Sequence, residues 1–101
     1  MTATPESVIK KKIKEYLKEI GAFWSMVQGG AYSKPGDPDM VVCYQGIYIG
    51  IEAKTPTGRQ SEIQKLREKE IKEAGGIYVL ARSVEDVQEV IEGLQERVGE
   101  E

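Results

Sequence analysis

Histidine is absent from this chain of 101 residues, and cysteine occurs only once. Without histidine there is no imidazole to activate a serine or cysteine nucleophile, to act as a general acid or base, or to hold zinc in the usual way. A single cysteine, Cys43, cannot form an intrachain disulfide or a CxxC pair. The chemistry that remains uses carboxylates, lysines, hydroxyls and hard metal ions bound through oxygen.

Long hydrophobic runs are also missing. No apolar stretch approaches the roughly 18 residues that a membrane span needs. The first six residues lack the basic and apolar regions of a signal peptide. Hydrophobic residues make up 40% of the chain and charged residues 31%, a balance typical of soluble globular proteins. We therefore expect one cytoplasmic domain over residues 1–101, without membrane contact.

The net charge of −3 argues against a protein whose only role is to bind nucleic acid, because such domains are usually basic. The charges are unevenly distributed, however, and acids gather toward the C-terminus. The sequence leaves two interpretations open, a locally basic surface on an acidic protein or ordinary solvated helix faces. The densest group of lysines falls in the first predicted helix and comprises Lys10, Lys11, Lys12, Lys14 and Lys18.

Apolar spacing and turn residues predict seven secondary-structure elements. Helices are expected over 5–20, over 61–74 and from Ser83 onward. Strands are expected over 22–28, 39–44, 47–54 and 77–81. The resulting order is αβββαβα, an α/β fold with a central mixed sheet flanked by helices.

Two of these elements carry specific predictions about burial. Cys43 lies in the apolar strand 39–44 and is expected in the core. The second helix is expected to bury a stripe formed by Ile63, Leu66, Ile71 and Ala74.

Two carboxylates and a lysine stand at the ends of two adjoining predicted strands. Asp39 opens one strand, and Glu52 and Lys54 close the next. Because side chains alternate along a strand, Glu52 and Lys54 point to the same face. Mg²⁺ and Mn²⁺ prefer carboxylate, carbonyl and water ligands, which Asp39, Glu52 and the backbone carbonyl of Ala53 can supply. With Lys54 to orient a water or a phosphate, this set suits metal-dependent phosphodiester hydrolysis.

The same residues also have a plainer interpretation. Glu52 and Lys54 can form a surface ion pair, and Asp39 can cap a turn after Pro38. Asp37 is a rival to Asp39 as the first carboxylate. Asp39 is preferred because it follows the proline directly and begins the strand, which fixes its direction.

The pattern of motifs resembles the VRR-NUC family within the PD-(D/E)XK nuclease superfamily, over essentially the whole chain. The matching features are Glu6 near the start of the first helix, the segments 36–39 (GDPD) and 52–54 (EAK), and the segment 58–64. The later segments 74–76 and 81–83 and the apolar strand between them also match. This resemblance implies a restriction-endonuclease-like core. It also implies a stand-alone nuclease domain of the kind found in phages and bacteria.

By position, the resemblance assigns roles to five side chains. Asp39 and Glu52 correspond to metal ligands, and Lys54 corresponds to the catalytic lysine. Glu6 corresponds to an acid on the first helix that approaches the metal, and Gln64 reaches the site from the second helix. Two alternatives stay open. An acid in the first helical turn, such as Glu6, favours the helix dipole. Gln64 lies three residues after Ser61, the spacing of a capping box.

Two loops contain candidate contacts to DNA. Tyr32, Ser33 and Lys34 lie in the glycine-rich loop before Asp39, which either touches the DNA backbone near the cut or is a plain connection. Arg59 follows the strand that carries Lys54 and is a candidate phosphate contact.

The function expected from this combination is a structure-specific DNA endonuclease that resolves Holliday junctions in repair and recombination. A homodimer suits this task, because two symmetric cuts need two active sites related by a two-fold axis. Alternatives are a nuclease acting on flaps or other branched DNA and a non-catalytic interaction module that keeps the fold. A restriction-type nuclease ranks lower, because the short chain has little room for a sequence-reading element.

Overall fold

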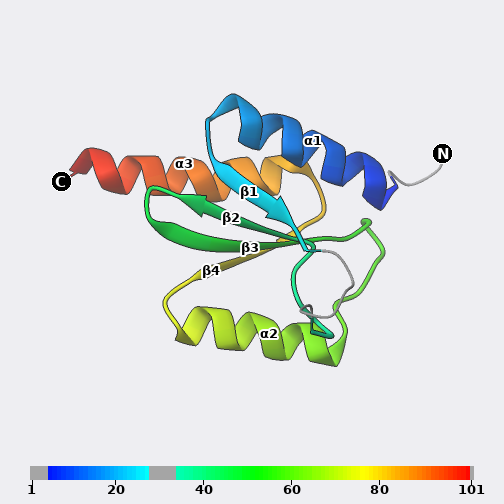
Figure 1. The fold of residues 1–101 in the computed structure, drawn as a ribbon. Helices are drawn as coiled ribbons and strands as arrows, with labels where there is room; N and C mark the ends of the chain where they lie inside the picture. The colour runs from blue at the N-terminus through cyan, green and yellow to red at the C-terminus, as the bar shows by residue number, and fades with distance from the viewer. Residues whose placement is uncertain (1–4, 28–33, 101) are drawn as a thin grey trace.

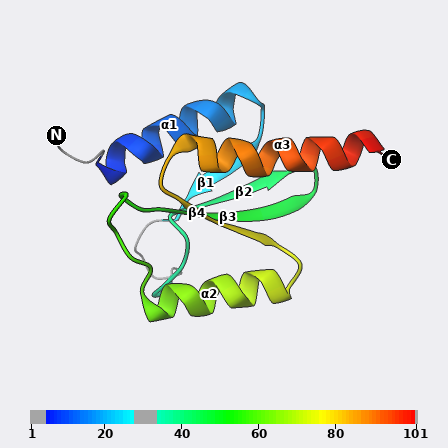
Figure 2. The same ribbon diagram turned by 180° about the vertical axis from the view of Figure 1, so that it is seen from behind.

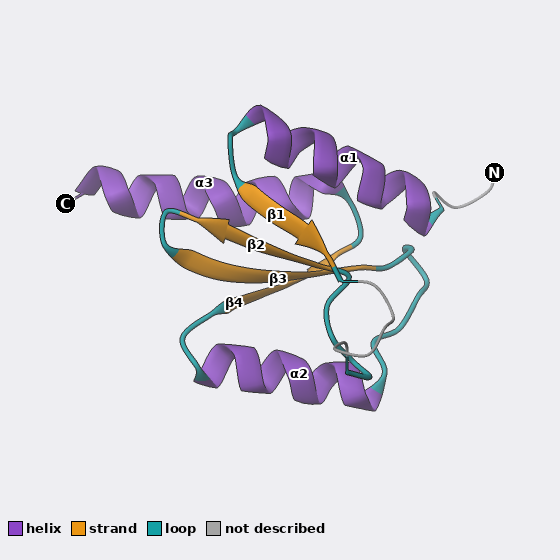
Figure 3. Ribbon diagram, in the orientation of Figure 1, coloured by secondary structure: helices purple, strands orange, loops and turns teal. Residues whose placement is uncertain are grey.

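The computed structural model describes residues 5–27 and 34–100 of the chain, and Figures 1 and 3 show its helices and strands. The elements occur in the predicted order αβββαβα. None of the helices within the described ranges is long and apolar enough to cross a membrane. The elements are α1 (Glu6–Glu19), β1 (Phe23–Met26), β2 (Met40–Tyr44), β3 (Ile47–Ala53), α2 (Glu62–Glu73), β4 (Ile77–Ala81) and α3 (Val84–Glu100).

The four strands form one mixed sheet in the order β1-β2-β3-β4. β1 and β3 both pair antiparallel with β2, whereas β3 and β4 are parallel. The β2–β3 hairpin turns at Gln45 and Gly46, whose φ angles of 52° and 79° are both positive, as a two-residue turn matched to strand twist requires. Parallel strands need a crossover, which α2 supplies. The predicted sheet class is therefore confirmed.

Helices α1 and α3 cover one face of this sheet and α2 covers the other (Figures 1 and 2). The apolar core lies on the α1/α3 side. Ile49, Ile51 and Ala53 alternate toward that side along β3 and are completely or almost completely buried. They pack with side chains of α1, β2, β4 and α3, among them Ile9, Ile13, Leu17, Met40, Val42, Val79, Ala81, Val87, Ile91 and Leu94.

The α2 side of the sheet is less densely packed, and α2 contributes no buried residue. The helix comes close to the sheet where glycine replaces a side chain. A Cβ at Gly50 would lie 2.8 Å from Cγ of Pro38 and 3.2 Å from Cδ1 of Ile71. A Cβ at Gly76 would likewise lie 2.9 Å from Cγ2 of Ile71. Ile71 therefore anchors α2 against the sheet.

Two burial predictions were wrong for a shared reason. Cys43 is exposed, and Ile63 and Leu66 are 38% and 46% exposed. Ala74 is also exposed, so only Ile71 of the expected stripe is partly covered. Cys43 alternates with the buried Val42 and so lies on the α2 side of the sheet, where α2 packs on β4 and leaves β2 open. Strand alternation identifies two faces but not which of them a helix covers.

Candidate active site

Asp39 and Glu52 are brought together by the register of the β2–β3 hairpin. Met40 pairs with Ile51, so one residue further along the ladder Asp39 lies beside Glu52. Oδ2 of Asp39 accepts a hydrogen bond from the backbone N–H of Ala53 at 2.8 Å. This bond orients the Asp39 carboxylate across the end of β3.

The backbone at the end of β3 also presents a carbonyl to the same place. The N–H of Lys54 donates to the carbonyl of Ala81 on β4 at 2.9 Å, whereas the N–H of Ala53 points toward Asp39. The N–H and C=O of one strand residue point to the same side of the strand. The Ala53 carbonyl therefore lies on the side of Asp39, as the expected ligand set requires.

Glu52 is a buried carboxyl group, with only 3% of the residue exposed. Burial raises its pKa from 4.5 to about 8, assisted by hydrogen bonding with Asp39 and by the negative charges of Asp39 and Glu6. The positive charge of Lys54 acts in the opposite direction and lowers this pKa. Lys54 itself is half-buried. A buried acid beside another acid favours a bound cation, because the cation relieves the repulsion between them.

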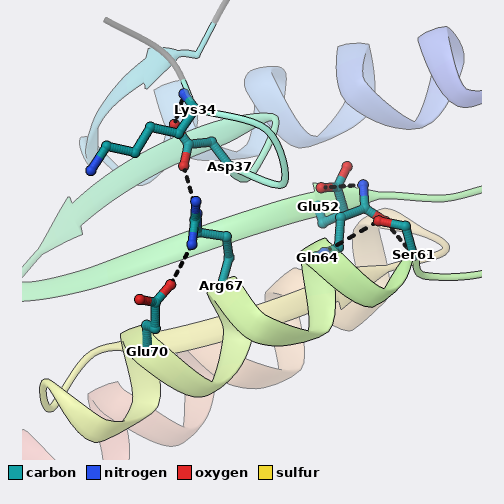
Figure 4. Close-up of polar contacts among 7 residues, drawn as sticks. All are labelled: Lys34, Asp37, Glu52, Ser61, Gln64, Arg67 and Glu70. Atoms are coloured by element: carbon teal, nitrogen blue, oxygen red, sulfur yellow. Dashed lines mark hydrogen bonds and ion pairs between the residues drawn. The ribbon is translucent and has the colours of Figure 1, made fainter.

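Gln64 makes both of the contacts that the sequence left as alternatives. Its side-chain Oε1 accepts a hydrogen bond from the backbone N–H of Ser61 at 2.8 Å. Its backbone N–H donates to the Ser61 Oγ at 3.2 Å, which completes a capping box. Nε2 of the same amide donates to Oε1 of Glu52 at 3.0 Å (Figure 4). The cap at the start of α2 thus orients the amide that reaches the buried carboxyl.

Glu6 approaches this pair through a lysine that sequence reasoning did not assign to the site. Nζ of Lys10 lies 3.2 Å from Oε1 of Glu6 and 3.6 Å from Oδ1 of Asp39. Burial lowers the pKa of Lys10, but attraction to Asp39 and Glu6 outweighs this and leaves the pKa raised. The four-residue spacing of Glu6 and Lys10 was a signal for their pairing, whereas the contact with Asp39 depends on the fold.

Asp37, the rival carboxylate, faces a different part of the molecule. It accepts a hydrogen bond from the Lys34 N–H at 2.8 Å and lies 3.4 Å from Nε of Arg67. Arg67 in turn contacts Glu70 at 2.5 Å, so these side chains form a separate polar chain over α2 (Figure 4). They border a hollow of about 460 Å³ that Tyr48 and other residues also line. The geometry joins Asp39, and not Asp37, to Glu52.

The candidate DNA contacts are only partly described. Arg59 and Lys34 are both exposed, as phosphate contacts must be. Tyr32 and Ser33 lie outside the described residues.

Two side chains to which sequence reasoning assigned no role, Arg82 and Gln60, hold the loop between β3 and α2. Nη1 of Arg82 donates to three backbone carbonyls of one turn, those of Thr55 at 2.6 Å, Gly58 at 2.7 Å and Pro56 at 3.3 Å. Further along, Nε2 of Gln60 donates to Oε1 of Glu68 and to the hydroxyl of Tyr78, both at 3.1 Å. These contacts fix the backbone on either side of Arg59.

The oxygen donors fit a hard divalent ion. Two carboxylates and a carbonyl match the preference of Mg²⁺ for one or two carboxylates completed by water. The Lys10 ammonium already places a positive charge between Glu6 and Asp39. Among the described residues, no group of three or more histidine, cysteine or acidic side chains is close enough to hold a metal ion by itself. Water, the backbone or substrate would therefore complete the coordination.

A solved structure described as a VRR_NUC domain matches this chain with a TM-score of 0.72. The chain has the VRR_NUC fold. The match covers 86% of this chain and 94% of the solved one, at 21% sequence identity. No family model matches the sequence, and no curated protein matches it. The VRR_NUC resemblance inferred from the motifs is confirmed at the level of the fold, and the αβββαβα order with a mixed sheet agrees with it.

Proposed function

We propose that this chain is a VRR-NUC nuclease in which residues 1–101 act as one domain, and that it hydrolyses phosphodiester bonds of DNA with the help of Mg²⁺ or Mn²⁺. One observation carries the proposal. Asp39 and the buried Glu52 lie side by side at the end of β3, close in sequence to Lys54, and Gln64 donates a hydrogen bond to Glu52. In a chain without histidine, this is the group of side chains best suited to phosphoryl chemistry.

The metal ligands proposed are Asp39, Glu52 and the Ala53 carbonyl. Glu6, which is paired with Lys10, would join them only if its side chain moved closer to the ion. A bound divalent ion would neutralise charge on the phosphoryl oxygens and make a bound water more acidic. The ion would also stabilise the charged form of Glu52, whose pKa of about 8 reflects burial beside Asp39. The ammonium of Lys10 would then be free to contact the phosphate as well as Glu6 and Asp39.

The remaining residues position the reactants. Lys54 orients the attacking water or the scissile phosphate, which its place beside Glu52 supports. Gln64 holds Glu52 through its amide, and the N–H of Ala53 holds Asp39. Arg59, Lys34, Ser33 and Tyr32 are proposed as contacts to the DNA backbone.

The substrate proposed is branched DNA, first of all a four-way junction, cut by a homodimer in the cytoplasm of the bacterial or phage-infected cell. Two copies related by a two-fold axis provide the two sites that symmetric resolution needs. Flaps and other branched DNAs are the nearest alternatives.

The test combines solution mass with cleavage assays. The mass of the protein is measured by light scattering, and labelled four-way junction, flap and linear duplex of equal length are incubated with Mg²⁺ or Mn²⁺. We expect a dimer that cuts the junction fastest and is inactive in EDTA. Preference for the linear duplex would contradict the junction proposal. Binding without cleavage under all metal conditions would favour the non-catalytic alternative.

A further inference from the structure

The three helices differ sharply in charge. Five lysines against three acids give α1 a charge of +2. In α2 four basic residues balance four acids. In α3 six acids outnumber one arginine, for a charge of −5. On a chain of net charge −3, α1 is the helix to which a polyanion would be attracted.

The basic residues of α2 are already neutralised by acids of the same helix. Lys65 lies 3.1 Å from Glu62, Lys69 lies 3.9 Å from Glu73, and Lys72 lies 2.7 Å from Glu68. Arg67 pairs with Glu70 and Asp37. Such pairs contribute little to stability, but they reduce the attraction of α2 for an external anion.

The lysines of α1 behave differently. Within residues 5–27 and 34–96, Lys10 is the α1 lysine with an ion pair, and Lys11, Lys12, Lys14 and Lys18 have none. Lys11 and Lys18 are exposed and Lys14 is half-exposed. Their charges are therefore available to a partner.

Three of these lysines form a row that starts at the candidate active site. Ile9, Ile13 and Leu17 define the buried stripe of α1. Lys10, Lys14 and Lys18 each follow one residue later, so they line one flank of that stripe, with Lys11 beside them. Glu19 lies on another side of the helix, whereas Glu15 lies next to the row, four residues after Lys11 and three before Lys18.

The direction of the row connects it to the chemistry. Lys10 contacts Asp39, and α1 then runs from that end of the molecule back over β1 (Figure 1). At 1.5 Å per residue, Lys18 lies about 12 Å beyond Lys10 along the helix. This span corresponds to roughly three or four nucleotides of one strand at 3.4 Å each.

We infer that Lys14 and Lys18 of this row, together with the adjacent Lys11, form a docking row for the sugar-phosphate backbone of the nucleic acid whose reactive phosphate lies at Asp39 and Glu52. The inference rests on the proposed function, because it takes the position of the reactive phosphate from it. Contacts of this kind fix the register of the backbone and are independent of base sequence. The row accounts for the lysine-rich segment of the sequence, which the catalytic residues leave unexplained.

The chain offers a matched pair of variants to test this row. Lys14→Gln/Lys18→Gln and Lys65→Gln/Lys69→Gln each remove two lysines spaced four residues apart on one helix. Binding of a fluorescent four-way junction is measured by anisotropy without divalent ions between 50 and 200 mM salt. The α1 variant should bind roughly tenfold more weakly, with a log Kd–log salt slope smaller by about 2. The α2 variant should stay within about twofold of the wild type, and circular dichroism verifies that both variants are folded.

The outcomes separate this inference from the proposed function. Equal losses in the two variants, or an unchanged salt slope in the α1 variant, overturn the docking row even if the wild type cleaves DNA. Loss of binding confined to the α1 variant supports the row, even if the wild type proves unable to cleave. If the wild type binds no nucleic acid at all, both proposals fail.

Discussion

The two faces of the sheet are built on different physical principles. On the α1/α3 face, Ile13, Leu17 and Ile51 are completely buried among other aliphatic side chains. On the α2 face, the side chain buried near the C-terminal end of β3 belongs to an acid, Glu52. Helix α2 itself buries no residue. One face supplies hydrophobic stabilisation, whereas the other holds an acidic group in an environment that raises its pKa.

This difference shows how a small domain can accommodate a costly site. An ionised carboxylate is expensive to bury, and a chain of 101 residues has only one core to offset that cost. Placing the core on one face and the acids at the edge of the other separates the two requirements. Strand β3 serves both, because Ile51 and Glu52 are neighbours that point in opposite directions.

The largest expected effect comes from weakening the apolar face. Ile13→Ala should lower the free energy of unfolding by about 2–5 kcal/mol, because a completely buried aliphatic side chain leaves a cavity. Leu66→Ala on α2 is the matched control, and it should cost less than about 1 kcal/mol because Leu66 is 46% exposed. Urea denaturation measures both. Similar losses in the two variants would contradict the division between the faces.

The second effect concerns catalysis at the charged face. Asp39→Ala and Lys54→Ala should each reduce the cleavage rate at least ~100-fold, since each removes a group that supports charge or water in the transition state. Asp37→Ala is the control, because Asp37 contacts Lys34 and Arg67 instead of Glu52. The rates are compared at saturating metal and DNA. An equally large loss in Asp37→Ala would remove the distinction between the two acids.

A smaller effect should separate positioning of the loop from contact with DNA. Arg82→Gln removes the donor shared by the Thr55, Pro56 and Gly58 carbonyls, and misplacement of the adjoining Lys54 should lower kcat roughly tenfold. Arg59→Gln removes an exposed candidate phosphate contact and should raise KM with little change in kcat. Arg82→Lys retains a donor and should recover part of the activity. Identical kinetic profiles for Arg82→Gln and Arg59→Gln would refute separate roles.

The smallest effect is a pH dependence of stability in the metal-free protein. The pKa of Glu52 rises from 4.5 to about 8 on folding. Between these pH values the folded state holds a proton that the unfolded state has lost, so stability should fall as pH rises from about 5 to about 8. Glu52→Gln should weaken this decline, and its Tm should exceed that of the wild type by a few degrees at pH 8 but not at pH 5. Thermal unfolding in EDTA at both pH values checks the prediction, and parallel pH profiles for the two proteins would contradict it.

The sequence was sufficient to predict the order of elements and the type of sheet, because the apolar periods and the glycine and proline breaks are local features. The preference for Asp39 over Asp37 agrees with the geometry, because Asp39 lies beside Glu52 and Asp37 contacts Arg67. The shared face of Glu52 and Lys54 stays a prediction, since β3 ends at Ala53. The roles of these residues in catalysis stay predictions.

Other features depend on contacts between distant segments and could not be read locally. The exposure of Cys43 follows from the part of the sheet that α2 leaves open. The contact between Lys10 and Asp39 requires the fold to bring α1 beside the residue that precedes β2. Arg82 donates to carbonyls of a loop 24 to 27 residues earlier in the chain. No local sequence pattern predicts these hydrogen bonds.

The central claim, that Asp39 and Glu52 form a divalent metal site, can be tested without any nucleic acid. The measurement is the Tm at pH 7.5 as Mn²⁺ is titrated into the wild type and into Asp39→Asn. A ligand that binds only the folded state adds about 2.7 kcal/mol of stability at a hundredfold excess over its Kd. We predict a rise in Tm that follows Mn²⁺ concentration in the wild type and is lost in Asp39→Asn. An unchanged wild-type Tm, or an equal rise in both proteins, would contradict the claim.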